Sequence, residues 1–407
     1  MVDKAVAQLR SSATIRDRCH NILQAVEAGR SAHFTLQLQR LEAVARQVEA
    51  VTRQHYPDLN IPYHSRWRHF EAGAVDRKAQ LDAGIAHLDS DAQARARIDL
   101  TIISVLLDAG AGAQWAYYET DSDQTFVRSE GLGVASFHAF MQGKFSSCSE
   151  DPYRVDAIAL QKINLSDLMD MFQVSESNPL TGLDGRLQLL QRLGQCLAAN
   201  PEVFGAEARP GLLFDSVTAH GHLHILPAAS VLSGLLNHFS PIWLTGSTLN
   251  GAPLGDCWRH PLAGGEGDSS GWVPFHKLSQ WLTYSLLEPF QWAGIEMTDL
   301  DGLTGLPEYR NGGLLLDMGV IIPQQKDFYT RSFTAADEAI IEWRALTIAL
   351  LDKLAPLVRD CLGKTAHEMP LACILEGGTW AAGRAVARQL REGGVPPINI
   401  VSDGTVF

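Results

Sequence analysis

The chain has 407 residues, 46% of them hydrophobic, which is enough to bury one large core or two closely packed lobes and excludes a linker or a disordered segment. Its net charge of −13 excludes the non-specific binding to a phosphate backbone by which basic proteins hold long nucleic acid. A small anionic substrate is compatible with this charge, because a site needs only a few local Lys or Arg residues.

The cysteines and the apolar segments indicate the cellular compartment. No C-x-x-C pair or regular spacing occurs among the six cysteines, so we expect reduced thiols with structural roles. The opening segment MVDKAVAQLRSSATIRDRCH has no apolar signal core, and no later stretch of about 18 uncharged apolar residues follows. We therefore expect a cytoplasmic protein without a membrane partner.

The first part of the chain has a helical pattern. Between Ala13 and His55, apolar residues recur at three- and four-residue steps, which predicts two amphipathic helices. Pro57 and Pro62 interrupt this pattern. The segment from Tyr63 to Gly73, YHSRWRHFEAG, alternates aromatic and basic residues in an expected loop of the kind that lines a site.

From about Asp91 to Leu362, helical patterns alternate with short Gly- and Pro-containing loops, without a clean domain boundary. In the tail, LACILEGG and INIVSDGTVF predict short strands on either side of a helix from Trp380 to Glu392. The expected fold is therefore mainly α with a small C-terminal β element. Its expected parts are an N-terminal helical region (residues 1–99), a helical catalytic core (100–362) and a strand-helix-strand element (363–407).

Three segments place polar residues within apolar patterns: VPFHKLSQWLTYSLLEPF, TDLDGLTGLPEYRNGGLLLDMGVI and EAIIEWRALTIALLDKL. In the first, Pro274 suits a helix start, and three- and four-residue spacing makes Lys277, Gln280 and Tyr284 neighbours on one face. In the third, Glu342 and Arg344 lie on opposite sides of a helix, so we expect each to support a different neighbour.

In the second segment, Asp299, Asp301 and Glu308 surround a turn, and Tyr309-Arg310 precedes a flexible Asn311-Gly312-Gly313. The pattern predicts a carboxylate beside a hairpin. Cleavage of an N-glycosidic bond needs such a carboxylate to stabilise an oxocarbenium-like state and to activate water, together with a donor for the leaving group. Composition and spacing alone favour the simpler interpretation, in which Glu308 and Arg310 are surface charges on a turn.

A resemblance to the queuosine salvage family changes this balance. FHKLSQ, DLDGLTGLPEYR and EWRALT are similar to that family's F-[HY]-K-R-A-Q, D-x-[DE]-x-L-T-x-F-A-D-Y-R and E-[IV]-R-A-A-T, and LLDAGAGAQW lies where the family has an Asp and an aromatic residue. The family hydrolyses an N-ribosyl bond with a helical core related to helix-hairpin-helix glycosylases. The family's motif Asp is Glu308 here, and Pro307 replaces its Ala, so the carboxylate reaches one methylene further and a different substrate is expected.

A closer resemblance covers nearly the whole chain. DAGAGAQW, GAPLGDCWRH, VPFHKLSQWLTYSLLEP, DGLTGLPEYRNGG, LEGGTWAAGR and SDGTVF look like signature strings of the uracil-catabolism protein 4 family. That family belongs to a pathway in which a ribosylated urea is an intermediate. The two resemblances together imply a hydrolase that cleaves ribosylurea, or its 5′-phosphate, to urea and ribose or ribose 5-phosphate. The alternative is a non-catalytic pathway subunit that binds a nucleoside-like intermediate or a partner enzyme.

The resemblances also imply the residues of the site. The expected catalytic residues are Glu308, which activates water or stabilises charge, Lys277, which contacts the ribose or its phosphate, and Asp301, which orients. The expected substrate-binding residues are Trp115, Asp108, His276, Gln280, Tyr309 and Arg310. The expected ligand is a small ribosylated molecule, without a cofactor.

Two other motifs suggest different ligands. A strand would place His220, His222 and His224 of AHGHLH on one face like zinc ligands, but no partner ligand lies at a recognisable spacing, so we expect no metal. The glycines of LEGGTWAAGR lie between an expected strand and an expected helix, where backbone N–H groups can hold phosphate, yet their spacing matches neither a P-loop nor G-x-G-x-x-G.

Overall fold

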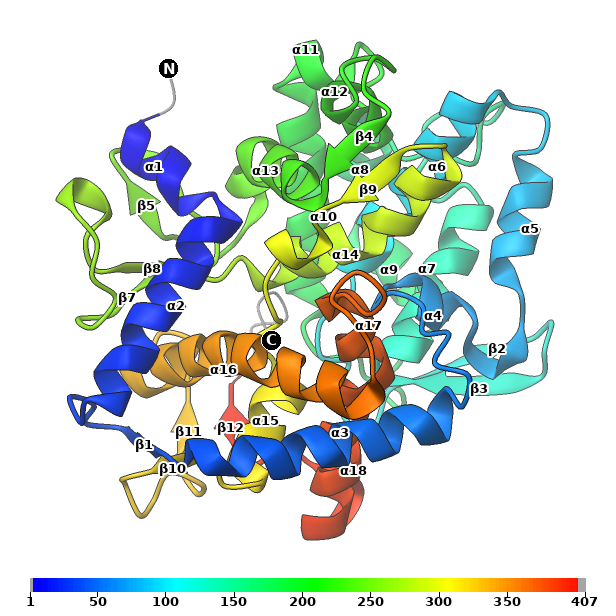
Figure 1. Ribbon diagram of the computed structural model, residues 1–407. Helices are drawn as coiled ribbons and strands as arrows, with labels where there is room; N and C mark the ends of the chain where they lie inside the picture. The colour runs from blue at the N-terminus through cyan, green and yellow to red at the C-terminus, as the bar shows by residue number, and fades with distance from the viewer. Residues whose placement is uncertain (1–2, 402–407) are drawn as a thin grey trace. The chain divides into compact units, whose positions relative to one another are not determined.

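The computed structural model describes residues 3–401 and is mainly helical, with 55% helix and 9% strand (Figure 1). This confirms the expected class. The likeness to helix-hairpin-helix glycosylases stays a prediction. All six cysteines are free thiols. Within residues 3–401, no helix is both long enough and apolar enough to span a membrane.

The chain forms two units, each assembled from separated stretches of sequence. The first contains the residues up to His64, then Ser247–Gln280 and Asp299–Val401, and the second contains Ser65–Gly246 and Trp281–Thr298. The parts expected from sequence (1–99, 100–362 and 363–407) are continuous stretches, whereas these units are not. The expected division therefore stays a prediction.

Helices of the first unit are arranged around the longest helix of the described chain. The helices are α1 (Lys4–Leu9), α2 (Ser12–Glu27), α3 (Leu41–His55), α15 (Tyr309–Asp317), α16 (Glu338–Leu362), α17 (Leu371–Ile374) and α18 (Trp380–Leu390), with the beginning of α14 (Lys277–Trp292). Helix α16 is buried along most of its length and packs on α2, α3 and α15, and Figure 1 shows α3 and α16 side by side. The two opening helices expected between Ala13 and His55 are confirmed as α2 and α3.

Local sequence sets the helix ends. The Ser11 hydroxyl accepts a hydrogen bond from Thr14 N at 3.2 Å and caps α2, while Gly363, at φ +66°, ends α16 in the left-handed conformation that glycine adopts without steric cost. Short 3₁₀ turns at η1 (Leu38–Arg40), η5 (Gly267–Ser269), η6 (Leu300–Gly302) and η8 (Glu392–Gly394), and a π-helical turn, η7 (Leu375–Thr379), connect these elements.

In the part of the chain that the structure describes, the strands of the first unit form two-stranded pairs. β1 (Phe34–Leu36) pairs with β10 (Ile321–Pro323), β5 (Thr248–Leu249) with β6 (Ala252–Pro253), and β7 (Cys257–Arg259) with β8 (Trp272–Pro274), all antiparallel, while β11 (Ser332–Phe333) and β12 (Asn399–Ile400) are parallel. Beside β7 and β8, the residues Val6, Leu9, Leu254, Cys257 and Trp272 form a buried cluster that holds α1.

The second unit surrounds helix α6 (Ser90–Leu106), which is buried on all sides from Ile98 to Leu106. Its other helices are α4 (Trp67–Phe70), α5 (Arg77–Gly84), α7 (Arg128–Met141), α8 (Ala157–Lys162), α9 (Leu165–Met171), α10 (Leu183–Ala198), α11 (Pro201–Phe204), α12 (Leu213–Val217) and α13 (Ala228–Phe239), with 3₁₀ turns η2 (Ala72–Ala74), η3 (Pro210–Leu212) and η4 (Ser240–Ile242). Two strand pairs complete it: β2 (Ala116–Glu119) with β3 (Gln124–Val127), and β4 (Ile225–Pro227) with β9 (Glu296–Thr298).

The expected loop from Tyr63 to Gly73 is partly helical. Its residues Trp67–Phe70 form α4, and Trp67, 1% exposed, packs edge-on against Phe70 and Trp292. Ordinary core packing therefore accounts for Trp67.

The strand expected at LACILEGG is wrong. Leu371–Ile374 form α17 after Pro370, and residues 375–379 continue as the π-helical turn. All four residues of α17 are buried, and a short run of apolar residues does not distinguish a buried strand from a buried helix. The helix expected at Trp380–Glu392 is confirmed as α18, and of INIVSDGTVF only Asn399–Ile400 form a strand, while residues 402–407 lie outside the described residues.

Candidate functional site

Glu308 lies at the start of helix α15, as its N-cap. Its carboxylate oxygens accept hydrogen bonds from Arg310 N at 2.7 Å and Asn311 N at 2.6 Å, so two of the unpaired N–H groups of the first turn are satisfied. Glu308 is half-buried. A carboxylate in this place is stabilised by the helix dipole, and each of its oxygens keeps a second lone pair for a water or a ligand.

The flexible hairpin expected after Glu308 is wrong, because Asn311, Gly312 and Gly313 are helical residues of α15. A Cβ atom on Gly312 would lie 2.3 Å from the Trp343 ring, and the Trp343 indole N–H donates to Gly312 O at 3.2 Å. The glycine therefore serves close packing of α15 on α16, a function that sequence alone does not distinguish from a flexible turn.

The segment before Glu308 is fixed by Asp301 of η6. Its carboxylate accepts hydrogen bonds from Arg359 Nη2 at 2.6 Å and Leu371 N at 2.7 Å, which joins η6 to α16 and α17. Arg16 also donates to the carbonyl oxygens of Asp301 and Leu303, at 3.1 and 2.8 Å. These contacts suit the orienting role expected of Asp301, and that role stays a prediction.

Gln280 contacts the same segment from the first turn of α14. Its amide group donates to the Thr304 hydroxyl and accepts from Thr304 N at 3.3 Å, and both residues are buried. The two hydrogen bonds hold the chain that leads to Glu308. The bonds to Thr304 give the buried Gln280 side chain a structural role, and the substrate-binding role expected of it stays a prediction.

Helix α14 begins at Lys277, not at Pro274, which belongs to strand β8. Asp256 holds this start: its carboxylate accepts from Lys277 N at 3.0 Å, and its carbonyl oxygen accepts from the N–H groups of Phe275 and His276. Lys277 itself is half-buried. A carboxylate from outside the helix therefore performs the capping that the proline was expected to provide.

Asp256 is bound in turn by Arg344 of α16, through two hydrogen bonds of 2.8 and 2.7 Å. Burial alone would raise the pKa of Asp256, but the Arg344 guanidinium and the neighbouring donors lower it to about 2. Arg344 also lies over the Phe275 ring, 4.1 Å from its centroid. The supporting role expected of Arg344 is thereby confirmed, whereas Asp256 was missed, because its partner lies 88 residues away.

His276 is buried and has a φ of +46°, a conformation that is uncommon outside glycine. Its Nε2 lies 2.8 Å from Leu9 O, and burial lowers the pKa of its imidazole. These observations describe a neutral side chain that attaches the start of α14 to α1. The binding role expected of His276 stays a prediction.

Tyr309 and Arg310 are half-buried in the first turn of α15. Arg310 Nη1 donates to Gly394 O at 2.9 Å. Helix α18 packs closely on the same turn, since a Cβ atom on Gly383 would lie 2.2 Å from Arg310 O.

Trp115 and Asp108 belong to the second unit. Trp115 is 1% exposed, its indole N–H donates to Phe172 O at 2.9 Å, and its ring packs on Phe172. Asp108 pairs with Arg66 at 2.9 Å. The other expected residues, Lys277, His276, Gln280, Asp301, Glu308, Tyr309 and Arg310, lie in the first unit around the starts of α14 and α15.

The histidines of AHGHLH do not lie on a strand. His220, His222 and His224 are exposed in the turn between α12 and β4. Among residues 3–401, no group of three or more His, Cys, Asp or Glu side chains is arranged to hold a metal ion.

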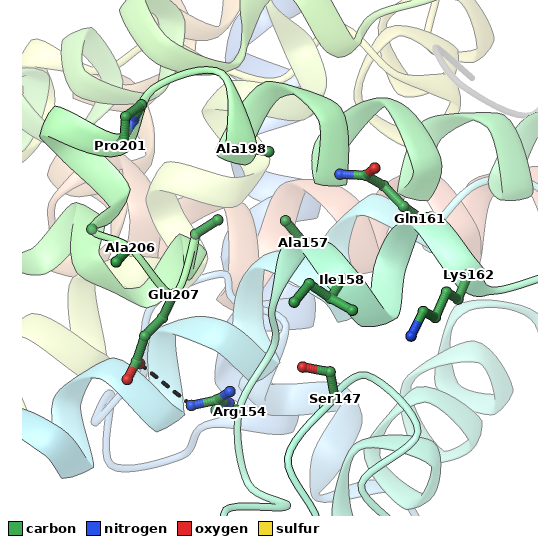
Figure 2. Close-up of a pocket in the computed structure, with 12 residues that line it drawn as sticks. Ser147, Arg154, Ala157, Ile158, Gln161, Lys162, Ala198, Pro201, Ala206 and Glu207 are labelled. Carbon is green, nitrogen blue, oxygen red and sulfur yellow. Dashed lines mark hydrogen bonds and ion pairs between the residues drawn. The ribbon is translucent and has the colours of Figure 1, made fainter.

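A cavity of about 400 Å³ lies in the second unit (Figure 2). Arg154, Glu207, Ser147 and Lys162 are among its lining residues, and Arg154 Nη1 lies 3.4 Å from Glu207 Oε2. Ser147 and Lys162 also line a second cavity, of about 410 Å³. None of the expected site residues lines either cavity.

The whole chain is similar to known proteins. A family model described as "Protein of unknown function (DUF1688)" matches residues 8–407. Uracil catabolism protein 4 of Lachancea kluyveri is 38% identical over 444 aligned positions, and Protein urg3 of Schizosaccharomyces pombe (strain 972 / ATCC 24843) is 39% identical over 415, each with 100% of both chains covered. The similarity therefore extends through both units and beyond the motif segments.

Proposed function

The chain belongs to the uracil catabolism protein 4 family, and from that membership we propose that it acts in uracil breakdown as a hydrolase of an N-ribosyl bond. Its substrate is ribosylurea or ribosylurea 5′-phosphate, and its products are urea and ribose or ribose 5-phosphate. The place in uracil catabolism follows from the relatives' names. The reaction rests on the resemblance of FHKLSQ, DLDGLTGLPEYR and EWRALT to the N-ribosyl hydrolase motifs.

The position of Glu308 is the observation that carries this proposal. Two backbone N–H groups hold the carboxylate at a helix start, at 2.6 and 2.7 Å, so its negative charge is stabilised and its direction is set before substrate binds. Hydrolysis of an N-riboside develops positive charge at C1′ and the ring oxygen. A preoriented carboxylate stabilises that charge and accepts a proton from the attacking water.

In this proposal the other residues bind the substrate or hold Glu308 in position. Lys277 contacts the ribose or its phosphate, and Asp301 and Gln280 hold the segment before Glu308, through Arg359 and Leu371 N in one case and Thr304 in the other. Because these supports are buried or bonded on both carboxylate oxygens, they suit positioning better than contact with the reacting atoms.

A second function is favoured by the same hydrogen bonds. A side chain that caps α15 has a structural reason to be Glu, so a non-catalytic subunit that binds a nucleoside-like intermediate would show the same geometry. The two functions differ in whether the charge of Glu308, rather than its capping bonds, is needed.

Substitutions at Glu308 separate charge from capping. Glu308→Gln keeps the size without the charge, Glu308→Asn keeps a favoured capping residue without the charge, and Glu308→Asp keeps both charge and capping on a shorter side chain. Asp89→Asn is the matched control, since Asp89 is an exposed N-cap carboxylate of α6 that accepts from Ala92 N at 2.8 Å. Urea release from ribosylurea and its 5′-phosphate is measured for each variant.

The hydrolase proposal predicts that Glu308→Gln and Glu308→Asn lower kcat by about 10²-fold or more, that Glu308→Asp retains more activity than either, and that Asp89→Asn is active. Binding of the substrate, measured by calorimetry, survives in the neutral variants. If wild type binds a ribosylated compound but releases no urea, the binding subunit is the correct function. Full activity in Glu308→Asn would show that Glu308 is only a cap.

A further inference from the structure

His64 and Glu376 form a nearly buried pair in the first unit. Each lies in a segment that the sequence singled out, Tyr63 to Gly73 and LEGGTWAAGR, but neither was named as a site residue. His64 Nδ1 lies 2.7 Å from Glu376 Oε2, and the two side chains are 12% and 17% exposed. The Tyr56 hydroxyl donates to the other carboxylate oxygen, at 3.3 Å. At this exposure the pair is shielded from most of the bulk water without being fully enclosed.

The carboxylate of this pair comes from a π-helical turn, η7, within LEGGTWAAGR. Such turns are rare and occur frequently at functional sites. Gly377 and Gly378 follow Glu376, and Cβ atoms there would lie 2.9 Å from Ile61 and 2.4 Å from Val48. The glycines thus bring η7 against α3 and the segment after it, and this close packing accounts for two of the glycines in a motif whose spacing fits no phosphate-binding loop.

The histidine is fixed by its backbone as well. His64 N donates to Ala372 O of α17 at 3.0 Å, and Cys373 Sγ lies 3.3 Å from Ile61 O. His64 therefore has two attachments to the α17–η7 segment, one from the main chain and one from the ring. A side chain held in this way has little freedom to turn, which is the property that a proton-transferring group needs.

The pair is connected to the element that carries Glu308. The η7 turn contacts α15 within the same unit, and α18, which continues directly from η7, packs on the first turn of α15 at Gly383 and Arg310. The helix that Glu308 caps is therefore packed on the segment that carries Glu376.

We infer that His64 is the catalytic acid that protonates the departing nitrogen, and that Glu376 is the positioning residue that orients it. An ionised carboxylate only accepts, so Nδ1–H is the donor to Glu376. The acid is therefore the imidazolium form, in which the second ring proton, the one for transfer, lies on Nε2. Urea is a poor leaving group as an anion, so cleavage of ribosylurea needs such a donor. This inference rests on the proposed hydrolase function.

The step balances in atoms and electrons. The C1′–N bond breaks with its electron pair going to nitrogen, which takes the Nε2 proton of the imidazolium and leaves as neutral urea. Water forms the new C1′–O bond and gives its proton to the Glu308 carboxylate. The proton then passes through solvent to the neutral imidazole, so one water is consumed and both side chains return to their first state.

Two leaving groups distinguish this role from a structural one. The substrates are ribosylurea and 4-nitrophenyl riboside, each with and without a 5′-phosphate, because nitrophenolate leaves as a stabilised anion without protonation. The variants are His64→Gln and Glu376→Gln. The matched control is His33→Gln, since His33 pairs with Glu338 at 3.1 Å in the same unit and has no contact with η7 among the hydrogen bonds described.

The expected result is a loss of about 10²-fold or more in kcat/KM for ribosylurea in His64→Gln, with less than about tenfold for the nitrophenyl riboside. Glu376→Gln shows the same selectivity with a smaller loss, and His33→Gln resembles wild type. Activity on the nitrophenyl compound also establishes that a variant is folded. Equal losses on both substrates, or no loss on ribosylurea, would overturn the inference.

The inference and the proposed function fail in different ways. Wild type that cleaves neither compound contradicts the hydrolase function itself. Wild type that releases urea and loses that activity in Glu308→Gln, but not in His64→Gln, contradicts only the role of His64. If wild type rejects the nitrophenyl compounds, His64→Gly is assayed on ribosylurea with added imidazole: restored urea release supports the role, and a loss without restoration counts against it.

Discussion

Asp256 and Arg344 form a buried ion pair at the start of α14, with hydrogen bonds of 2.8 and 2.7 Å. Burial opposes ionisation of Asp256, and Arg344 with the other donors lowers its pKa to about 2, below the ordinary value of 3.8. Because the folded pKa is the lower one, the resulting stability is complete above about pH 4 and is lost as the pH falls toward 2. The amount is on the order of 2 kcal/mol.

Asp256→Asn tests this pair. We expect it to lower the free energy of unfolding by about 3 to 5 kcal/mol at pH 7, because a buried guanidinium loses its counter-charge, and by less at pH 3, where wild type loses the same contribution. Urea denaturation at both pH values measures the difference. The control is Glu42→Gln, at an exposed pair with Arg46 of 3.9 Å. An equal loss of unfolding free energy at pH 7 and pH 3 would contradict an ionised Asp256 in the folded protein.

Lys277 is expected to bind rather than to react. Lys277→Ala should raise KM with little change in kcat, since contacts to ribose or phosphate are made in the ground state and the transition state alike. The increase should be larger for ribosylurea 5′-phosphate than for ribosylurea. Steady-state urea release measures both, with Lys353→Ala, at a surface pair with Glu27, as control. A fall in kcat at constant KM would instead give Lys277 a part in the chemical step.

At the scale of elements, the packing of α15 on α16 depends on a glycine that sequence analysis assigns to a flexible turn. Gly312 faces Trp343 with no room for a side chain, whereas a Cβ atom on its neighbour Gly313 would lie 3.1 Å from Pro397 Cδ, a contact that a small shift relieves. The two positions share one helix and one residue type, so they form a matched pair.

Gly312→Ala should destabilise the protein by about 1 to 3 kcal/mol, the usual cost of overpacking. Gly313→Ala should be neutral or stabilising, because alanine is about 1 kcal/mol more favourable than glycine inside a helix. Thermal and urea unfolding of the two variants provide the comparison. Equal destabilisation would mean that backbone flexibility, rather than packing on Trp343, is what both positions require.

At the scale of the molecule, the proposed reaction is carried out by protein side chains and water, without a metal ion. We predict that dialysis against EDTA leaves urea release and the helical circular dichroism spectrum unchanged, because His220, His222 and His224 are exposed in a turn and the proposed chemistry assigns no step to them. Metal analysis of the purified protein accompanies the assay. Stoichiometric zinc together with activity lost on chelation would refute this prediction.

Sequence alone determined the features of this protein that depend on neighbouring residues. The periodicity of Ala13 to His55 predicted α2 and α3, because a buried helix face repeats its apolar residues every three or four positions. The long shared strings identified the family, which the similarity over 100% of both chains confirms. The segments FHKLSQ, DLDGLTGLPEYR and EWRALT all lie in the first unit. Gln280 of the first segment bonds Thr304 of the second, and Lys277 of the first and Arg344 of the third both bond Asp256.

Only the tertiary structure decided how distant residues are paired. LACILEGG is helical, although a short buried apolar run is equally compatible with a strand, and its local pattern does not reveal the difference. Glu308 caps helix α15, which packs against Trp343 of α16 at Gly312. Asp256 meets Arg344 across 88 residues, and His64 meets Glu376 across 312. Such pairs follow from the packing of whole elements, so no local periodicity or spacing records them.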